Sequence, residues 1–144
     1  MTRPVEYYLR FALAAAFLSA VASRFGLWTG TPWPAAFTRF LSYTAEVNAF
    51  MPSVAIPFLA WAATIAETTL GVALVTGVYL RWTALAAALV LALFGTAMAL
   101  SLGVKSPLDY SVFSASAGAL LLSEHARHRS AMVHRPAGPA RGMP

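Results

Sequence analysis

Residues 54–79 read VAIPFLAWAATIAETTLGVALVTGVY, and this stretch decides the fold. As a helix rising about 1.5 Å per residue, it is longer than a bilayer hydrocarbon core of about 30 Å. A spanning helix with this excess length can tilt in the membrane. The stretch therefore predicts a tilted transmembrane helix, which Pro52 and Pro57 mark at its start.

Three more apolar runs accompany this stretch, at residues 7–27, 82–102 and 107–126. The chain is 59% hydrophobic and 10% charged, with a mean hydropathy of +0.67. A soluble domain of this composition would have too few polar residues to cover its surface. We therefore predict an all-α integral membrane protein in which residues 1–126 form a four-transmembrane-helix up-and-down bundle.

Proline and glycine indicate where the later helices begin and end. Gly103 suits the left-handed conformation that closes a helix. Ser106 followed by Pro107 predicts a helix start, with the serine as N-cap and the proline in the first turn. The first run also resembles a secretory signal, since Ala20-Val21-Ala22 follows a basic start. We expect it to be retained, because three further spans follow.

The segment between the first two spans is too aromatic for a solvated loop. Over residues 34–48, Phe37, Thr44 and their helical neighbours share one face, while Arg39 and Glu46 lie on the other. This pattern predicts an interfacial helix on the outer surface. It is an anchor or a lid over a lipid-accessible pocket.

Basic residues near the ends of the spans predict the orientation, because translocation disfavours them. Three fall on one side: Arg24, Arg39 and Lys105. The larger group falls on the other side: Arg3, Arg10, Arg81, Arg127, Arg129, Arg135 and Arg141. We expect a bacterial inner membrane protein with cytoplasmic N and C termini. Residues 127–144, rich in Pro, Gly and Arg, are expected to be a disordered tail, attracted to anionic lipid.

Glu67 is the strongest candidate for chemistry. An ionised side chain in the middle of a span costs about 2.5 to 3.5 kcal/mol on insertion scales, so it must face protein or water, or be protonated. Thr64 lies within one turn of it, and Thr96 reaches a similar depth in the third span. Arg10 lies roughly 13 Å nearer the cytoplasm, so an Arg10–Glu67 pair requires tilt. Glu67 is either a structural hydrogen-bonding group or a group that handles protons or binds a ligand.

Other polar residues offer weaker candidates for ligand binding. Arg10 either snorkels to the interface or anchors an anionic or carbonyl headgroup. Lys105 and Asp109 bracket the outer turn, where they are a structural pair or the mouth of a pocket. Ser114 belongs to a small polar stripe on the fourth helix that serves either close helix packing or the site.

Several classes of function are disfavoured by what the sequence contains. The chain has no cysteine, which excludes thiol catalysis, thiolate zinc sites and iron–sulfur clusters. Glu124, His125 and His128 offer two imidazoles but no evident third ligand, so we predict no metal site. The net charge of +5 lies at membrane boundaries and in the tail rather than on a folded face, so we expect no nucleic-acid partner.

The order of these features resembles the DoxX-like family of four-helix bacterial membrane proteins. The matching stretches are RFALAAAFL at 10–18, RFG at 24–26, ETTLGVALVTG at 67–77 with Arg81 beyond it, and KSPLDYSVFS at 105–114. This resemblance implies an up-and-down bundle and a role in membrane redox chemistry. A related protein type is the small subunit of thiosulfate:quinone oxidoreductase, and other relatives are associated with oxidative-stress complexes.

Three functions follow as expectations. The first is an accessory, quinone-facing subunit of a membrane redox complex, not a catalyst alone, in which Glu67 takes or donates a proton. The second is a structural subunit that only anchors or stabilises partners. The third is a binder or carrier of a small lipophilic molecule. Expected partners are the lipid bilayer and either other membrane or redox subunits or further copies of this chain.

Overall fold

The computed structural model describes residues 1–133, and these residues form helices joined by short turns. The helices are α1 (Arg3–Arg24), α2 (Trp33–Val47), the 3-10 turn η1 (Ser53–Ala55), α3 (Ile56–Thr76), α4 (Leu80–Leu102), α5 (Lys105–Asp109) and α6 (Val112–Val133). No strand occurs in this range. The all-α prediction is confirmed.

Three helices are long and apolar enough to cross a membrane. Within residues 1–133 they are Arg3–Arg24, Ser53–Thr76 and Leu80–Leu102. α6 is as long as α1, but it is not among the three, because its second half carries several charged and imidazole side chains. The fourth predicted span therefore stays a prediction.

Proline and glycine place most of the helix boundaries. α1, α2 and α3 each have a proline in the first two positions, where the missing N–H is not needed. Gly77 ends α3 in the left-handed conformation, at φ 75°, and donates its N–H to the Ala73 carbonyl. α3 and α4 therefore meet in a tight turn.

Three boundary predictions were wrong. Residues 107–126 do not form one helix, because Ser111 at φ 54° interrupts the helix between α5 and α6. Ser106 lies inside α5 rather than capping a helix. The predicted tail also starts too early, since α6 continues to Val133 and Arg129 there contacts Glu6. Residues 134–144 lie outside the described range.

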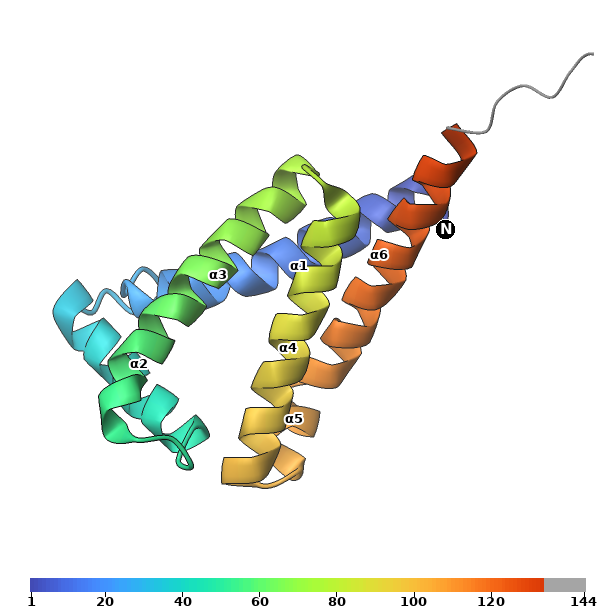
Figure 1. The fold of residues 1–144 in the computed structure, drawn as a ribbon. Helices are drawn as coiled ribbons and strands as arrows, with labels where there is room; N and C mark the ends of the chain where they lie inside the picture. The colour runs from blue at the N-terminus through green and yellow to red at the C-terminus, as the bar shows by residue number, and fades with distance from the viewer. Residues whose placement is uncertain (134–144) are drawn as a thin grey trace, which may run out of the picture.

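The four long helices pack as two close pairs, α1 with α3 and α4 with α6. Their shared core consists mostly of alanine and leucine. Figure 1 shows that α3 and α4 diverge from their connecting turn, and that α2 lies near the far end of α3. The core is therefore filled near the turn, and the helices separate toward α2.

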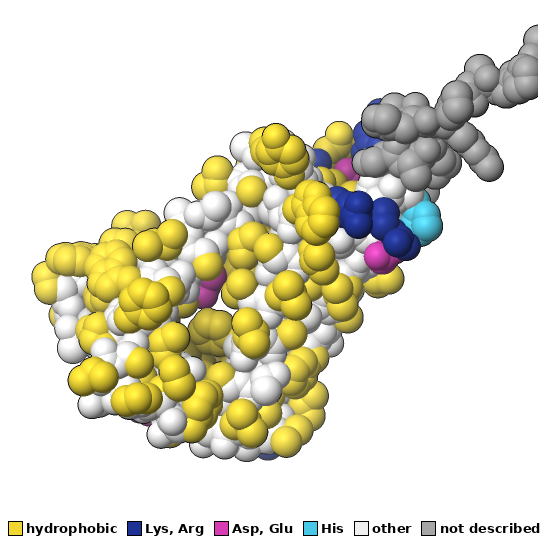
Figure 2. Space-filling view, in the orientation of Figure 1, with side chains coloured by type: hydrophobic (Ala, Val, Ile, Leu, Met, Phe, Trp, Pro, Cys, Tyr) yellow, Lys and Arg dark blue, Asp and Glu magenta, His cyan; other side chains and the backbone are white. Residues whose placement is uncertain are grey.

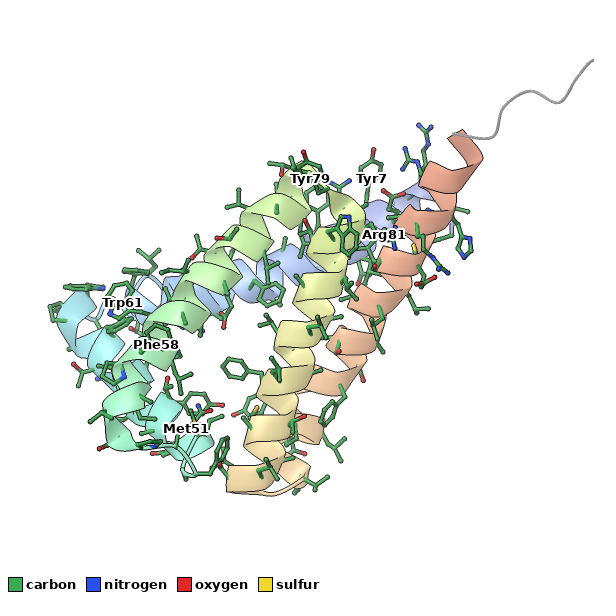
Figure 3. All side chains as sticks on the ribbon, viewed as in Figure 1. Tyr7, Met51, Phe58, Trp61, Tyr79 and Arg81 are labelled. Carbon is green, nitrogen blue, oxygen red and sulfur yellow. The ribbon has the colours of Figure 1, made fainter. Side chains whose placement is uncertain are left out.

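The surface carries large hydrophobic side chains. Leu93 is 70% exposed and Leu100 72% exposed, both on α4. Figure 2 shows hydrophobic side chains over most of the visible face. In Figure 3, Tyr7, Tyr79 and Arg81 lie at the end where α3 turns into α4, whereas Met51 and Phe58 lie toward the opposite end. An apolar outside with buried charges inside is the arrangement expected of a protein surrounded by lipid.

Buried polar groups tie the helices together at the end near the α3–α4 turn. Arg10 donates from Nε to the Leu74 carbonyl (3.1 Å) and from an Nη to the Val75 carbonyl (3.0 Å), so it caps the end of α3. Glu6, 3% exposed, lies 3.3 Å from His125 and 3.1 Å from Arg129 of α6. α1 is thus fastened to both α3 and α6.

The α4–α6 pair gives a direct test of this packing. Ser116 is buried and donates a hydrogen bond of 2.8 Å to the Ala88 carbonyl of α4. Ser116→Ala is expected to lower the free energy of unfolding by about 0.6 to 1.5 kcal/mol. The control is Ser114→Ala on the same helix, where the side chain is exposed and no change is expected. Equal effects of the two variants in detergent unfolding would contradict the assigned α4–α6 register.

Candidate functional site

A buried ion pair joins α1 to the middle of α3. Arg24 and Glu67 have side chains only 5% exposed. One Arg24 Nη donates to both Glu67 carboxylate oxygens at 2.7 Å. Such short charge-assisted bonds offset part of the cost of holding two charges away from water. The pair requires α1 and α3 to stay in this register.

The rest of the Arg24 guanidinium is also held. Its other Nη donates to the Thr64 hydroxyl at 3.0 Å, and that hydroxyl donates to the Ala60 carbonyl at 2.8 Å. The centroid of the Phe40 ring of α2 lies 3.8 Å from Arg24 Cζ, a cation–π distance. Arg24 therefore bonds to α3 and packs against α2, and its orientation is fixed.

A cavity of about 630 Å³ lies beside this polar cluster. Its size falls in the range of sites that hold one small molecule, about 300 to 1,000 Å³. Its apolar walls come from α1, α2, α4 and α6, and include Leu13, Phe17, Leu91, Phe94 and Ala115. Arg24 and Glu67 both line it, so an apolar chamber has charged groups in its wall.

Two side chains of α2 add polar groups to the same cavity. Arg39 lines it and makes no hydrogen bond or ion pair within residues 1–133. Tyr43 lines it one helical turn later. Burial, and after it the nearby Tyr110 and Glu46, raise the pKa of the Tyr43 phenol above its ordinary value of 10.0. The phenol thus keeps its proton at neutral pH and remains a hydrogen-bond donor.

A second cavity of about 290 Å³ lies among α2, α3 and α4. Its lining is mostly apolar and includes Val47, Leu59 and Leu93. Four residues line both cavities: Phe40, Tyr43, Val90 and Phe94. The second cavity therefore adjoins the first on the side where α3 and α4 separate.

The structure brings together two of the residues singled out from the sequence. Glu67 and Thr64 both contact Arg24. Arg10 does not join them, because its guanidinium is engaged by the Leu74 and Val75 carbonyls at the other end of α3. The tilt that an Arg10–Glu67 pair requires is therefore not present.

The remaining sequence candidates lie away from the cavity lining. Thr96 is exposed and donates to the Ala92 carbonyl of its own helix. Lys105 and Asp109 form an exposed ion pair within α5. Ser114 is exposed on α6. Tyr110, which follows this ion pair, does line the cavity.

Sequence reasoning missed Arg24 as the partner of Glu67, and Arg39 and Tyr43 as cavity residues. Arg24 was counted as a charge at the outer interface. The available signal was a single acid in one span and a lone arginine near the end of the neighbouring one, a combination that often indicates pairing inside a membrane. For Arg39 and Tyr43, the four-residue spacing on an amphipathic helix was the only signal.

The imidazoles of α6 point to different partners. His125 lies 3.3 Å from Glu6, while His128 lies 3.9 Å from Glu124. Within residues 1–133, no three His, Cys, Asp or Glu side chains gather into a group that could hold a metal ion.

Comparisons with known proteins leave the family open. No protein-family model matches the chain, and neither a curated protein nor a solved structure matches it significantly. The function must therefore be argued from the site itself.

Proposed function

We propose that this chain is a membrane protein that binds a small lipophilic molecule with a polar head in the cavity beside Arg24 and Glu67. The observation that carries the proposal is the position of the ion pair. It lies in the wall of an apolar cavity of about 630 Å³, and both side chains line that cavity. Sites for small molecules characteristically combine apolar walls with a few fixed polar groups.

The fixed Arg24–Glu67 pair gives the cavity wall a polar group of set orientation. Arg24 is held by Glu67, Thr64 and the Phe40 ring, so little side-chain freedom is lost when a ligand binds. The apolar walls contribute about 0.8 kcal/mol for each CH₂ group that leaves water. Orientation and affinity therefore come from different parts of the same cavity.

A quinone is one molecule of this kind. The resemblance to the DoxX-like family supports an accessory role in a quinone-linked membrane redox complex. In that role the ion pair would face the quinone head, and Glu67 would take or donate the proton. Glu67→Gln also removes the charge that pairs with Arg24, so a proton role requires that turnover per assembled complex falls as well as the amount of complex.

We further propose a four-helix spanning bundle, with α6 as the fourth span and α2 at the outer interface. Support comes from the close packing of α6 along α4 and from the buried and exposed faces of α2. Arg10 and Arg129 both contact Glu6, while Arg24 is neutralised by Glu67. The positive charge at the α1–α6 end favours cytoplasmic termini in a bacterial inner membrane.

The proposed function is tested by purification from the native membrane in mild detergent, with mass spectrometry of the lipids. Wild-type protein is expected to carry a defined lipophile at about one per chain. Ala16→Phe places a ring in the cavity that Ala16 lines, and should remove that molecule. Ala15→Phe is the control, since Ala15 is exposed and lines neither cavity.

Either of two results would overturn the proposal. One is that wild-type protein carries only ordinary phospholipid. The other is that Ala16→Phe and Ala15→Phe retain the same lipophile equally. Redox subunits that co-purify with a chain carrying no lipophile would support a structural role instead.

A further inference from the structure

We propose that the bound molecule is a single-chain lipid with an acidic head, whose carboxylate meets Arg39 while its chain lies along the apolar walls. A long-chain fatty acid is the simplest member of this class. The inference rests on the proposed function and adds the charge and shape of the ligand.

The charge of the cavity wall is not balanced. Three charged side chains line the larger cavity: Arg24, Arg39 and Glu67. Arg24 and Glu67 neutralise each other through their short ion pair, which leaves the single positive charge of Arg39. Arg39 is exposed rather than buried, and the apolar wall beside it strengthens its attraction for a negative charge relative to bulk water.

Among the residues that the structure describes, no acidic side chain supplies this charge. Glu46, further along α2, forms no ion pair with the described residues and does not line the cavity, and Asp109 is paired with Lys105. Glu67 already gives both carboxylate oxygens to Arg24. Within residues 1–133, Arg39 is therefore the cation that a ligand at this cavity can neutralise.

Tyr43 adds a second donor for the same head. Arg39 and Tyr43 are four residues apart on α2, so they share a helix face, and both line the larger cavity. A carboxylate can accept bonds from a guanidinium and from a phenol at the same time. A neutral head, such as that of an alcohol or a quinone, gains less from the same pair.

The shape of the space favours one hydrocarbon chain. The larger cavity is lined by Leu13, Phe17 and Leu91 away from its polar groups, and the smaller cavity of about 290 Å³ adjoins it. Figure 2 shows a hollow between α3 and α4 with mostly hydrophobic walls. The hydrocarbon chain of a lipid can reach this space from the bilayer and lie in it, while the acidic head of the lipid stays away from the bilayer hydrocarbon.

The test is direct binding in nanodiscs of neutral phosphatidylcholine, with radiolabelled palmitate and hexadecanol at a pH where palmitate is ionised. These probes have equal chains and differ in the head. Wild-type protein is expected to bind palmitate at about one per chain and about tenfold more tightly than hexadecanol, the difference of one charged hydrogen bond. Arg39→Gln should weaken palmitate binding about tenfold, to near the affinity for hexadecanol, and weaken hexadecanol binding much less.

The matched control is Arg81→Gln, which removes an exposed arginine that lies outside the cavity lining and beside Trp82. It should keep the full preference for palmitate. Equal affinities of wild-type protein for the two probes, or an unchanged preference in Arg39→Gln, would overturn the acidic-head inference while the proposed function stands. Failure of both probes and of a decyl quinone to bind would overturn the proposed function itself.

Discussion

Glu67→Ala is expected to lower the free energy of unfolding by about 3 to 5 kcal/mol, because it leaves the Arg24 charge buried without its partner. Arg24 has a side chain 5% exposed and cannot turn to water without leaving its contacts with Thr64 and Phe40. Unfolding of the purified chain in mixed detergent micelles measures the loss.

Two further variants separate the buried charge from the general cost of removing a carboxylate. Glu124→Ala removes an exposed carboxylate that pairs with Arg127, and should change stability by less than about 1 kcal/mol. The double variant Arg24→Met with Glu67→Met should recover most of the lost stability, since no charge remains unpaired. A loss in Glu67→Ala no larger than that in Glu124→Ala would contradict the buried pair.

Gly26→Ala is expected to cost about 3 kcal/mol or more. Gly26 follows α1 at φ 75°, a conformation that strains any residue with a Cβ. A Cβ there would also lie 1.9 Å from the Thr31 carbonyl oxygen, which belongs to the backbone and cannot turn away. The loop would have to shift, and Arg24, two residues earlier, would lose its alignment with Glu67.

Gly30→Ala is the matched control in the same loop. Gly30 also has a positive φ, 64°, but a Cβ there would meet no atom within 4 Å. It should cost only the conformational strain, about 1 kcal/mol. Thermal unfolding of both variants in the same detergent compares them. Equal unfolding temperatures for the two variants would contradict the close approach of Gly26 to Thr31.

The helices were predictable because lipid imposes simple rules on a sequence. Length and hydropathy identify residues 54–79 as a span, and Gly103 closes the helix that it follows. The break at Ser111 was not predictable in the same way. Serine at positive φ carries no strong sequence signal, and the residues on both sides of it are compatible with a continuous helix.

The candidate site was predictable only in part. Glu67 stands out because a carboxylate in an apolar span needs a partner, but hydropathy does not say how the neighbouring helices cross. Glu67 lies about 16 Å along α3 from Ile56, so straight parallel helices would keep it far from the end of α1. Figure 1 shows that α1 crosses α3 at an angle, which brings Arg24 within reach. That crossing depends on side-chain packing, which periodicity alone does not reveal.

Occupation of the cavity by a lipophile is tested by photolabelling in neutral nanodiscs with diazirine-bearing palmitate and hexadecanol. Labelled peptides are then mapped with and without excess unlabelled probe. We expect competed labels on residues that line the cavity, such as Phe17, Leu91 and Ala115. Label on the exposed Leu89 and Leu100 of α4 should not be competed. Label found only on such lipid-facing residues would contradict occupation of the cavity. Equal competition at cavity residues and lipid-facing residues would contradict it as well.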